Sequence, residues 1–260
     1  MFKTVAETAR DGHAEAGDRI PPYLLLVDEI NRGNIPQILG ELVTQLEWDK
    51  REGQSGAVAT NLAHSGEAGF TVPSNLYLVG TMNTADRSIA LLDAAIRRRF
   101  SFLRLDPDLQ FAANRLGYGQ FTGDDAAWTD EAEQKLRQAS SLDQQLRAAT
   151  VLAVAKINDK LLRETDVPRG KRIGHSYILP PARGEGQPTP EELSRIWNHK
   201  LFPLLEEFFY NDYRTLEETV FENTTSLFDD DTPSFADLTI EKLTKSLKNF
   251  VLSPREQASD

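Results

Sequence analysis

The stretch Tyr23-Leu-Leu-Leu-Val-Asp-Glu29 decides the fold, because it is a continuous apolar run of strand length that ends in two carboxylates. Continuous rather than alternating apolarity predicts a strand that is buried on both faces, as in a parallel sheet. In an open parallel sheet, ligands bind beyond the carboxyl ends of the strands, where Asp28 and Glu29 would lie. An Asp there can hold Mg²⁺ through water, and the adjacent Glu can polarise a water that attacks a γ-phosphate. The alternative interpretation is that the two acidic residues only cap the strand.

A second buried strand is predicted over Leu76-Tyr-Leu-Val-Gly-Thr-Met82, and it ends at Asn83. Apolar residues at helical spacing over 38–46, after a capping Asn34, predict a crossover helix between the two strands. Residues 50–74 are rich in Gly, Ser and Ala and predict a loose hairpin or a surface loop. The amide of Asn83 can orient the attacking water or touch the γ-phosphate, whereas the alternative is an Asx turn.

Three consecutive arginines, Arg97, Arg98 and Arg99, follow a predicted helix that Ser88 can cap, and a short third strand is expected over 100–105. Arginine supplied across a subunit boundary neutralises charge that develops on a transferred phosphoryl group, and Arg98 or Arg99 is predicted to do this. The alternatives are complementarity to a helix C-terminus and a nucleic-acid patch. Strands that alternate with helical crossovers predict an α/β domain.

Beyond Pro107 strand signals mostly disappear and helical periodicity takes over, first over 129–164 and again after Thr189, with a kink expected at Pro203. A last helix is expected near 238–251. The predicted organisation is therefore a partial α/β core over 1–106, a helical subdomain over 107–225, and a tail with one helix over 226–260.

Composition excludes several classes of protein. The 260 residues are 40% hydrophobic, which is enough to bury a core, and none of the apolar runs is long enough for a membrane span. A net charge of −11 would repel a nucleic-acid duplex, so any grip on DNA must be local or lie on another segment. The absence of cysteine excludes disulfides and thiolate metal sites and fits a cytoplasmic protein, and 4 scattered histidines form no ligand cluster.

The segment Met82-Asn-Thr-Ala-Asp-Arg-Ser88 resembles the signature motif of the McrB family, the nucleotide-hydrolysing motor subunits of modification-dependent restriction systems. Four more segments resemble the same family: Leu26-Val-Asp-Glu-Ile-Asn-Arg-Gly-Asn34, Ala95-Ile-Arg-Arg-Arg-Phe-Ser-Phe102, Arg172-Ile-Gly-His-Ser-Tyr177 and Ile196-Trp-Asn-His-Lys-Leu-Phe-Pro-Leu-Leu-Glu-Glu-Phe-Phe-Tyr210. The similarity runs from near residue 2 to about residue 213.

This resemblance implies an AAA+ fold, a hexameric ring, Mg²⁺-dependent hydrolysis of GTP or ATP, and a nuclease partner subunit of the McrC type. By motif match, Asp28 and Glu29 take the Walker B roles, with Asp28 holding Mg²⁺ through water, and Asn83 is sensor 1. Asp86 and Arg87 belong to the signature loop, near the subunit interface.

The resemblance also places His175 and Ser176 in an α-helical lid, where they would contact nucleotide or the neighbouring domain. For His175, a structural histidine is the alternative interpretation.

One required motif is missing, because the family pattern includes G-x-x-x-x-G-K-[ST] before Walker B and this sequence contains no such stretch. We therefore expect an N-terminally truncated, partial AAA+ core whose parallel sheet lacks the phosphate-loop strand, exposes strand edges and binds nucleotide poorly by itself. A truncated gene, a wrongly assigned start codon or a split protein completed by another chain would each explain this. The DNA-reading domain that relatives carry upstream is expected to be absent as well.

Two other functions compete with this interpretation. One is a non-catalytic interaction module that joins a ring through its arginine face and lid. The other is a different AAA+ clade, such as a MoxR- or dynein-like remodelling ATPase, and the signature over 82–88 argues against it. A phosphate-loop sequence upstream in frame, or in a neighbouring chain, would favour the motor over the interaction module.

Overall fold

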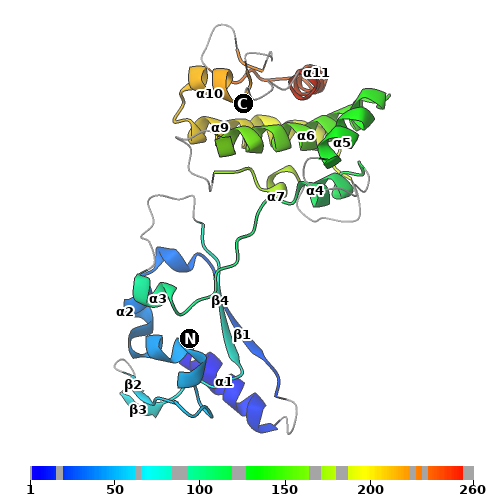
Figure 1. The fold of residues 1–260 in the computed structure, drawn as a ribbon. Coiled ribbons are helices and arrows are strands. Elements are labelled where there is room, and N and C mark those ends of the chain that lie inside the picture. Colours follow the sequence, from blue (N-terminus) through cyan, green and yellow to red (C-terminus); the bar gives the residue numbers. More distant parts are fainter. Residues whose placement is uncertain are drawn as a thin grey trace. The chain divides into compact units, whose positions relative to one another are not determined.

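The computed structural model contains two compact units, Met1–Arg104 and Leu105–Asp260, and each is described by itself (Figure 1). The structure describes residues 2–15, 20–62, 66–83, 93–118, 127–163, 171–179, 187–222, 227–229 and 234–253. None of the helices in these ranges is long and apolar enough to cross a membrane.

The first unit combines a small parallel sheet, a hairpin and short helices. In chain order its elements are α1 (Phe2–Glu15), β1 (Tyr23–Val27), a 3-10 turn (Ile30–Arg32), α2 (Ile35–Leu39), two further 3-10 segments (Gly40–Leu46 and Trp48–Lys50), β2 (Thr60–Leu62), β3 (Glu67–Phe70), β4 (Leu76–Gly80) and α3 (Ala94–Arg97).

Strands β1 and β4 pair in parallel, from Tyr23 opposite Leu76 to Val27 opposite Gly80. The crossover between them begins with α2, which Asn34 caps by accepting a hydrogen bond from the Gln37 backbone N–H. It then includes the antiparallel pair β2–β3, so the expected hairpin within 50–74 is present. The prediction of two parallel strands joined by a helical crossover is confirmed.

Within the first unit, the described residues cover only one face of this sheet. Tyr23, Leu25 and Leu76 pack into a cluster with α1 and the hairpin. The opposite face carries Leu24, Leu26, Tyr77 and Val79, which are 46% to 62% exposed. The expectation that both faces are buried is therefore wrong for these residues, because continuous apolarity reports what a strand can bury and not which neighbour is present.

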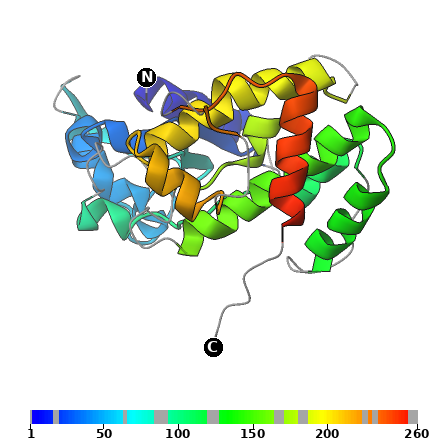
Figure 2. The ribbon, with the colours of Figure 1, turned by 90° about the horizontal axis from the view of Figure 1, so that it is seen from above.

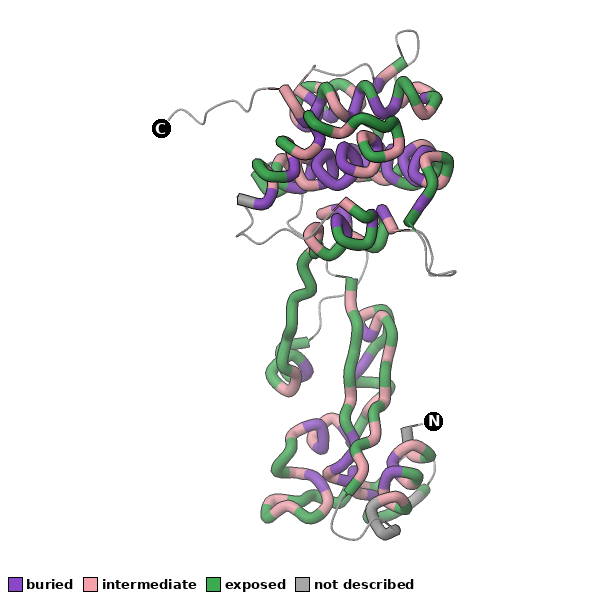
Figure 3. Tube along the Cα trace, turned by 90° about the vertical axis from the view of Figure 1, so that its right-hand side faces the viewer, coloured by how far each residue is buried: buried purple, intermediate pink, exposed green. Residues whose placement is uncertain are grey.

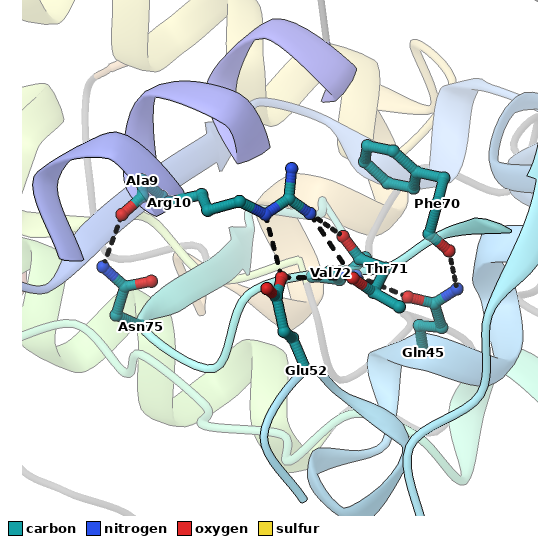
Figure 4. Close-up of polar contacts among 8 residues, drawn as sticks. All are labelled: Ala9, Arg10, Gln45, Glu52, Phe70, Thr71, Val72 and Asn75. Carbon is teal, nitrogen blue, oxygen red and sulfur yellow. Dashed lines mark hydrogen bonds and ion pairs between the residues drawn. The ribbon is translucent and has the colours of Figure 1, made fainter. Parts of the chain in front are cut away.

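Buried and partly exposed polar contacts join α1 and the hairpin to the start of β4 (Figure 4). The Asn75 side-chain amide donates to the Ala9 carbonyl oxygen at 2.9 Å, and Arg10 pairs with Glu52 at 2.9 Å. The Gln45 side-chain N–H donates to the Phe70 carbonyl oxygen, and the Gln45 Oε1 accepts from the Val72 backbone N–H. Since each buried donor or acceptor left unpaired would cost about 1–3 kcal/mol, this network fixes where β4 begins.

The expected third strand over 100–105 is absent from the structure. No strand among the described residues pairs with this segment, and Leu103 and Leu105 are each 86% exposed. An apolar segment becomes a strand only where a neighbour accepts and donates its backbone hydrogen bonds, so apolarity alone did not decide this stretch.

The second unit is helical and has one continuous core. Its elements are α4 (Leu109–Arg115), α5 (Ala127–Gln138), α6 (Leu142–Arg163), α7 (His175–Ile178), α8 (Pro190–Ile196), a π-helical turn (Trp197–Leu201), α9 (Phe202–Phe208), α10 (Tyr213–Thr219) and α11 (Ile240–Leu252). Every one of these helices contributes to the core.

Helix α6 is the centre of that core, and it is buried on nearly all sides between Leu146 and Leu161 (Figure 3). Helix α11 crosses it and packs against it (Figures 1 and 2). The Trp197 indole N–H donates to the Thr150 hydroxyl at 3.0 Å. Asn158 exchanges two hydrogen bonds with the Ile173 backbone, which ties the segment before α7 to α6.

The helix predicted after Thr189 is present and starts with the expected capping box, in which Thr189 and Glu192 each bond the other's backbone N–H. Its break is not a kink at Pro203 alone, because a π-helical turn over Trp197–Leu201 precedes the proline. Proline lacks a backbone N–H, so one carbonyl in the preceding turn loses its usual partner and the turn widens there.

Candidate functional site

The carboxyl ends of β1 and β4 lie side by side, because Val27 is opposite Gly80 in the parallel register. Asp28 and Glu29 follow the first of these ends, and Asn83 lies three residues beyond the second. The structure therefore brings together the three residues for which the sequence predicted Walker B and sensor roles. This edge of the sheet is open, since Asp28 and Asn83 are both exposed.

Thr81, which the sequence analysis did not select, holds the two strand ends together. Its hydroxyl accepts a hydrogen bond from the Glu29 backbone N–H at 2.9 Å and donates one to Asp28 Oδ1. Its backbone N–H donates to the Val27 carbonyl oxygen, and its carbonyl oxygen accepts from the Ile30 N–H. The signal that could have found it is a hydroxyl residue at the carboxyl end of a buried strand, beside two acidic residues.

Glu29 has a left-handed backbone conformation, with φ 48° and ψ 49°. Such a conformation is uncommon for a residue with a side chain and persists where surrounding contacts enforce it. The Glu29 carboxylate forms an ion pair with Arg32, with 2.8 Å between Oε2 and Nε. Both side chains are largely accessible to solvent, so this pair contributes little stability and is easily exchanged for another partner.

Asn83 follows a methionine that packs against the apolar cluster beneath the edge. Met82 contacts the group formed by Ile30, Ile35 and Ile96. The side-chain N–H of Asn31 donates to the Asn83 carbonyl oxygen at 3.4 Å. The same cluster joins the turn after β1, α2 and α3, so the helix that carries the arginines is fixed next to the acidic turn.

The three arginines after Ile96 differ in their contacts. Arg97 lies over the Phe102 ring, 5.1 Å from its centroid. Arg99 is tucked in, with a side chain only 9% exposed, and its Nε lies 2.9 Å from Glu47 Oε1. Arg98 is exposed and, within the described ranges, its side chain makes no hydrogen bond or ion pair, while its backbone N–H donates to the Ala94 carbonyl oxygen.

The remaining predicted residues lie elsewhere. Asp86 and Arg87 fall outside the described residues. His175 and Ser176 belong to the helical unit, where His175 Nδ1 accepts a hydrogen bond from the Asp108 backbone N–H at 3.0 Å. The His175 ring also meets the edge of Phe111 at a centroid distance of 5.6 Å. These contacts give His175 a structural part in joining α7 to α4.

The donors at the sheet edge suit a magnesium ion held mainly by water and phosphate. No group of three or more His, Cys, Asp or Glu side chains within the described ranges is arranged to hold a metal. Asp28 is exposed, and its Oδ1 accepts a hydrogen bond from the Thr81 hydroxyl. Mg²⁺ retains several waters and takes one or two protein carboxylates in nucleotide sites, so Asp28 with one free oxygen fits it.

Comparisons with known proteins match both units. The sequence model for the family described as AAA domain (dynein-related subfamily) matches residues 4–100, and that for McrB, alpha-helical lid domain, matches residues 149–217. The Type IV methyl-directed restriction enzyme EcoKMcrB subunit of Escherichia coli is 34% identical over 191 residues, which are 73% of this chain and 37% of that subunit. The chain is an McrB-like AAA+ protein.

A second relative is also part of a restriction enzyme. The Type II restriction enzyme BsuMI component YdiS of Bacillus subtilis is 33% identical over 98 residues, which are 34% of this chain and 28% of that protein. The chain thus spans about a third of the length of these relatives. The McrB-like family and the combination of an AAA domain with a helical lid, both predicted from motifs, are confirmed.

Proposed function

We propose that this chain is the Walker B to lid part of a nucleoside triphosphatase that drives a restriction complex. The observation that carries the proposal is that Asp28, Glu29 and Asn83 follow the neighbouring carboxyl ends of the parallel strands β1 and β4. The two relatives are subunits or components of restriction enzymes, which supports the biological setting.

Each residue at the edge has a part that its chemistry allows. Asp28 would hold Mg²⁺ through water, and the ion supplies charge neutralisation on the triphosphate when bound. Glu29 would accept a proton from the attacking water, and Asn83 would orient that water. Because Glu29 now pairs with Arg32 in an exposed contact, it is free to exchange that partner for water when nucleotide binds.

We propose that a phosphate-binding segment comes from outside this sequence, since the sequence contains no G-x-x-x-x-G-K-[ST] motif. The open edges of the two-stranded sheet β1–β4, as seen in the described residues, support this proposal, because an unpaired edge can pair with a further strand. We propose that the complete sheet contains that segment and that it supplies the purine and phosphate contacts for GTP or ATP.

Partners follow from the family and from charge. We propose a ring of identical subunits, hexameric when complete, in which Arg98 reaches the neighbouring nucleotide, and a nuclease subunit of the McrC type as the second component. DNA would be read through another domain, in keeping with the net charge of −11 here. His175 and Ser176 are proposed to lie near nucleotide or the neighbouring domain from the lid side, and Asp86 and Arg87 near the subunit boundary.

The test is Glu29→Gln in the ring completed with its phosphate-loop segment. Nucleotide binding should be retained, while turnover should fall about 10²- to 10⁴-fold, because the base is lost and the shape is kept. Glu41→Gln is the matched control, since Glu41 is an exposed glutamate of the same unit, outside the edge. Unchanged turnover in Glu29→Gln would remove this residue from the mechanism.

A second measurement separates the motor from the non-catalytic ring module. Labelled GTP and ATP are titrated into the purified 260-residue chain with Mg²⁺ and then into the completed ring. We expect weak binding by the chain alone and binding with turnover in the ring. A completed ring that binds nucleotide without hydrolysing it, even with a nuclease partner, would favour the interaction module.

A further inference from the structure

We propose that Thr81 is a positioning residue for nucleotide hydrolysis, which sets the backbone of Glu29 and the carboxylate of Asp28 through one hydroxyl group. This inference rests on the proposed function of the β1–β4 edge. Thr81 is not one of the residues that the family resemblance selects at this edge, which are Asp28, Glu29 and Asn83. The inference follows from contacts among described residues alone.

Thr81 bonds four successive residues of the acidic turn. Its backbone N–H and carbonyl oxygen bond Val27 and Ile30 at 3.0 and 2.9 Å. Its hydroxyl bonds the two residues between them, as acceptor from the Glu29 N–H and as donor to the Asp28 carboxylate. The backbone bonds would survive any substitution, whereas the two hydroxyl bonds depend on the side chain alone.

The bond to the Glu29 N–H explains why a glutamate is left-handed there. A residue with a Cβ enters this region only when nearby groups over-determine its conformation, at a cost of order 1–3 kcal/mol. The Thr81 oxygen lies 2.9 Å from the Glu29 nitrogen and so holds the peptide in the orientation that the left-handed turn requires. Loss of this acceptor would let the turn relax and would move the Glu29 carboxylate relative to Asn83.

The hydrogen bond from Thr81 gives the two carboxylate oxygens of Asp28 different roles. Oδ1 receives the Thr81 hydroxyl proton, and Oδ2 has no other hydrogen bond within the described residues. A carboxylate fixed through one oxygen presents the other in a defined direction, which is what a metal-bound water needs. Thr81 therefore affects hydrolysis through Asp28 and Glu29 without touching nucleotide itself.

The experiment compares Thr81→Ser with Thr81→Ala in the completed ring. Serine and alanine differ by one oxygen, so the comparison isolates the hydroxyl from the methyl group and from the backbone. We expect Thr81→Ser to keep kcat within about threefold of wild type and Thr81→Ala to lower it about 10- to 100-fold, since the hydrogen bond to the Asp28 carboxylate and the hydrogen bond from the Glu29 N–H that holds the strained turn are both lost. KM should change less than threefold in both variants.

A merely structural role would give a different pattern. Thr8→Ala is the control, because the Thr8 hydroxyl bonds only the Thr4 carbonyl oxygen of its own helix. The Mg²⁺ concentration for half-maximal turnover should rise in Thr81→Ala and stay unchanged in Thr8→Ala. The double variant Thr81→Ala with Glu29→Gln should lose less turnover than the product of the two single losses, because the part of Thr81 that acts through Glu29 is already removed by Glu29→Gln.

Two outcomes overturn the proposal. One is equal kcat in the folded serine and alanine variants, and the other is a loss in Thr81→Ala that adds fully to that of Glu29→Gln. If Glu29→Gln itself leaves turnover unchanged, the proposed function fails first, and that result is distinct from either of these. Thermal unfolding of each variant, measured alongside, confirms that the compared rings are folded.

Discussion

At the scale of single residues, three adjacent arginines that look equivalent in sequence have three different environments. The Arg97 guanidinium lies over the Phe102 ring, and the Arg99 side chain is nearly buried beside Glu47. The Arg98 side chain is exposed and has no hydrogen bond or ion pair within the described residues. An arginine that acts on a neighbouring subunit must reach outward, which is why we propose Arg98 rather than Arg99 for that role.

Arg98→Ala should therefore reduce turnover of the completed ring about 10³-fold and leave the unfolding temperature of the subunit unchanged. Arg99→Ala should instead lower stability by about 1 kcal/mol, since it removes a half-buried ion pair.

Mixing Arg98→Ala subunits with Glu29→Gln subunits should restore part of the activity, because some interfaces then combine an intact Arg98 with an intact Glu29. Steady-state turnover as a function of mixing ratio checks this, and a strictly additive loss would contradict a role across the interface.

Residues with chemistry at strand ends could be predicted from the sequence, and residues that act through contacts could not. Asp28, Glu29 and Asn83 interrupt or follow apolar runs, so their shared edge follows from parallel pairing alone. Thr81 is polar too, but its importance depends on the register that places its oxygen beside the Glu29 nitrogen. The different environments of Arg98 and Arg99 depend on Glu47, which lies far away in sequence.

At the scale of helices and strands, local signals worked where an element is stabilised by its own sequence. The capping box at Thr189 led to a helix that is present, and the last helix expected near 238–251 is present as α11. The segment over 100–105 failed because a strand needs a partner, and sequence pattern does not supply one. Helices α4 and α10 were missed because each is only 7 residues long, too short for a clear repeat.

A buried charge cluster links α6 to the turn after α10. Glu222 pairs with Lys156 at 3.3 Å and with Lys160, and all three side chains are mostly buried. Burial acts to raise the pKa of Glu222, but the hydrogen bond to Lys160 and the charges of both lysines outweigh it, so the pKa is lowered. A lowered folded-state pKa means that this carboxylate contributes stability above its unfolded pKa and loses it as the pH falls through the folded value.

Glu222→Gln should thus lower the stability of the helical unit by about 1–2 kcal/mol near pH 7. This cost lies between the stability lost when an exposed ion pair is broken and that lost when a fully buried one is broken. The difference between wild type and variant should shrink as the pH drops below the ordinary Glu range, because protonation then removes the same charge. Urea unfolding at several pH values measures this. Glu217→Gln, at a partly exposed position of α10 nearby in sequence, serves as control, and a pH-independent difference would speak against the ion cluster.

At the scale of the whole molecule, the two units differ in how much core they have. The helical unit has one core that includes residues from all its helices, whereas the first unit has two small clusters around β1 and α3. Since buried apolar area is the main source of stability, the helical unit should be the more stable of the two.

Residues 105–260 expressed alone should therefore fold with one cooperative urea transition, and that transition should match the later of two in the 260-residue chain. Trp197→Ala provides the control, because this fully buried side chain should cost about 3–5 kcal/mol on truncation. Far-ultraviolet circular dichroism follows both. A fragment that shows no cooperative transition would mean that the helical unit depends on the first.

The two-stranded sheet has a consequence for hydrogen exchange. In the described chain β1 and β4 each have one strand neighbour, so alternate amides on the outer side of each strand have no partner in a sheet. These amides should exchange with deuterated solvent quickly, while amides in the middle of α6 should be protected up to the global stability. When a further strand joins the sheet, the fast amides of one edge should become slow together, so their exchange rate reports directly on completion of the nucleotide site.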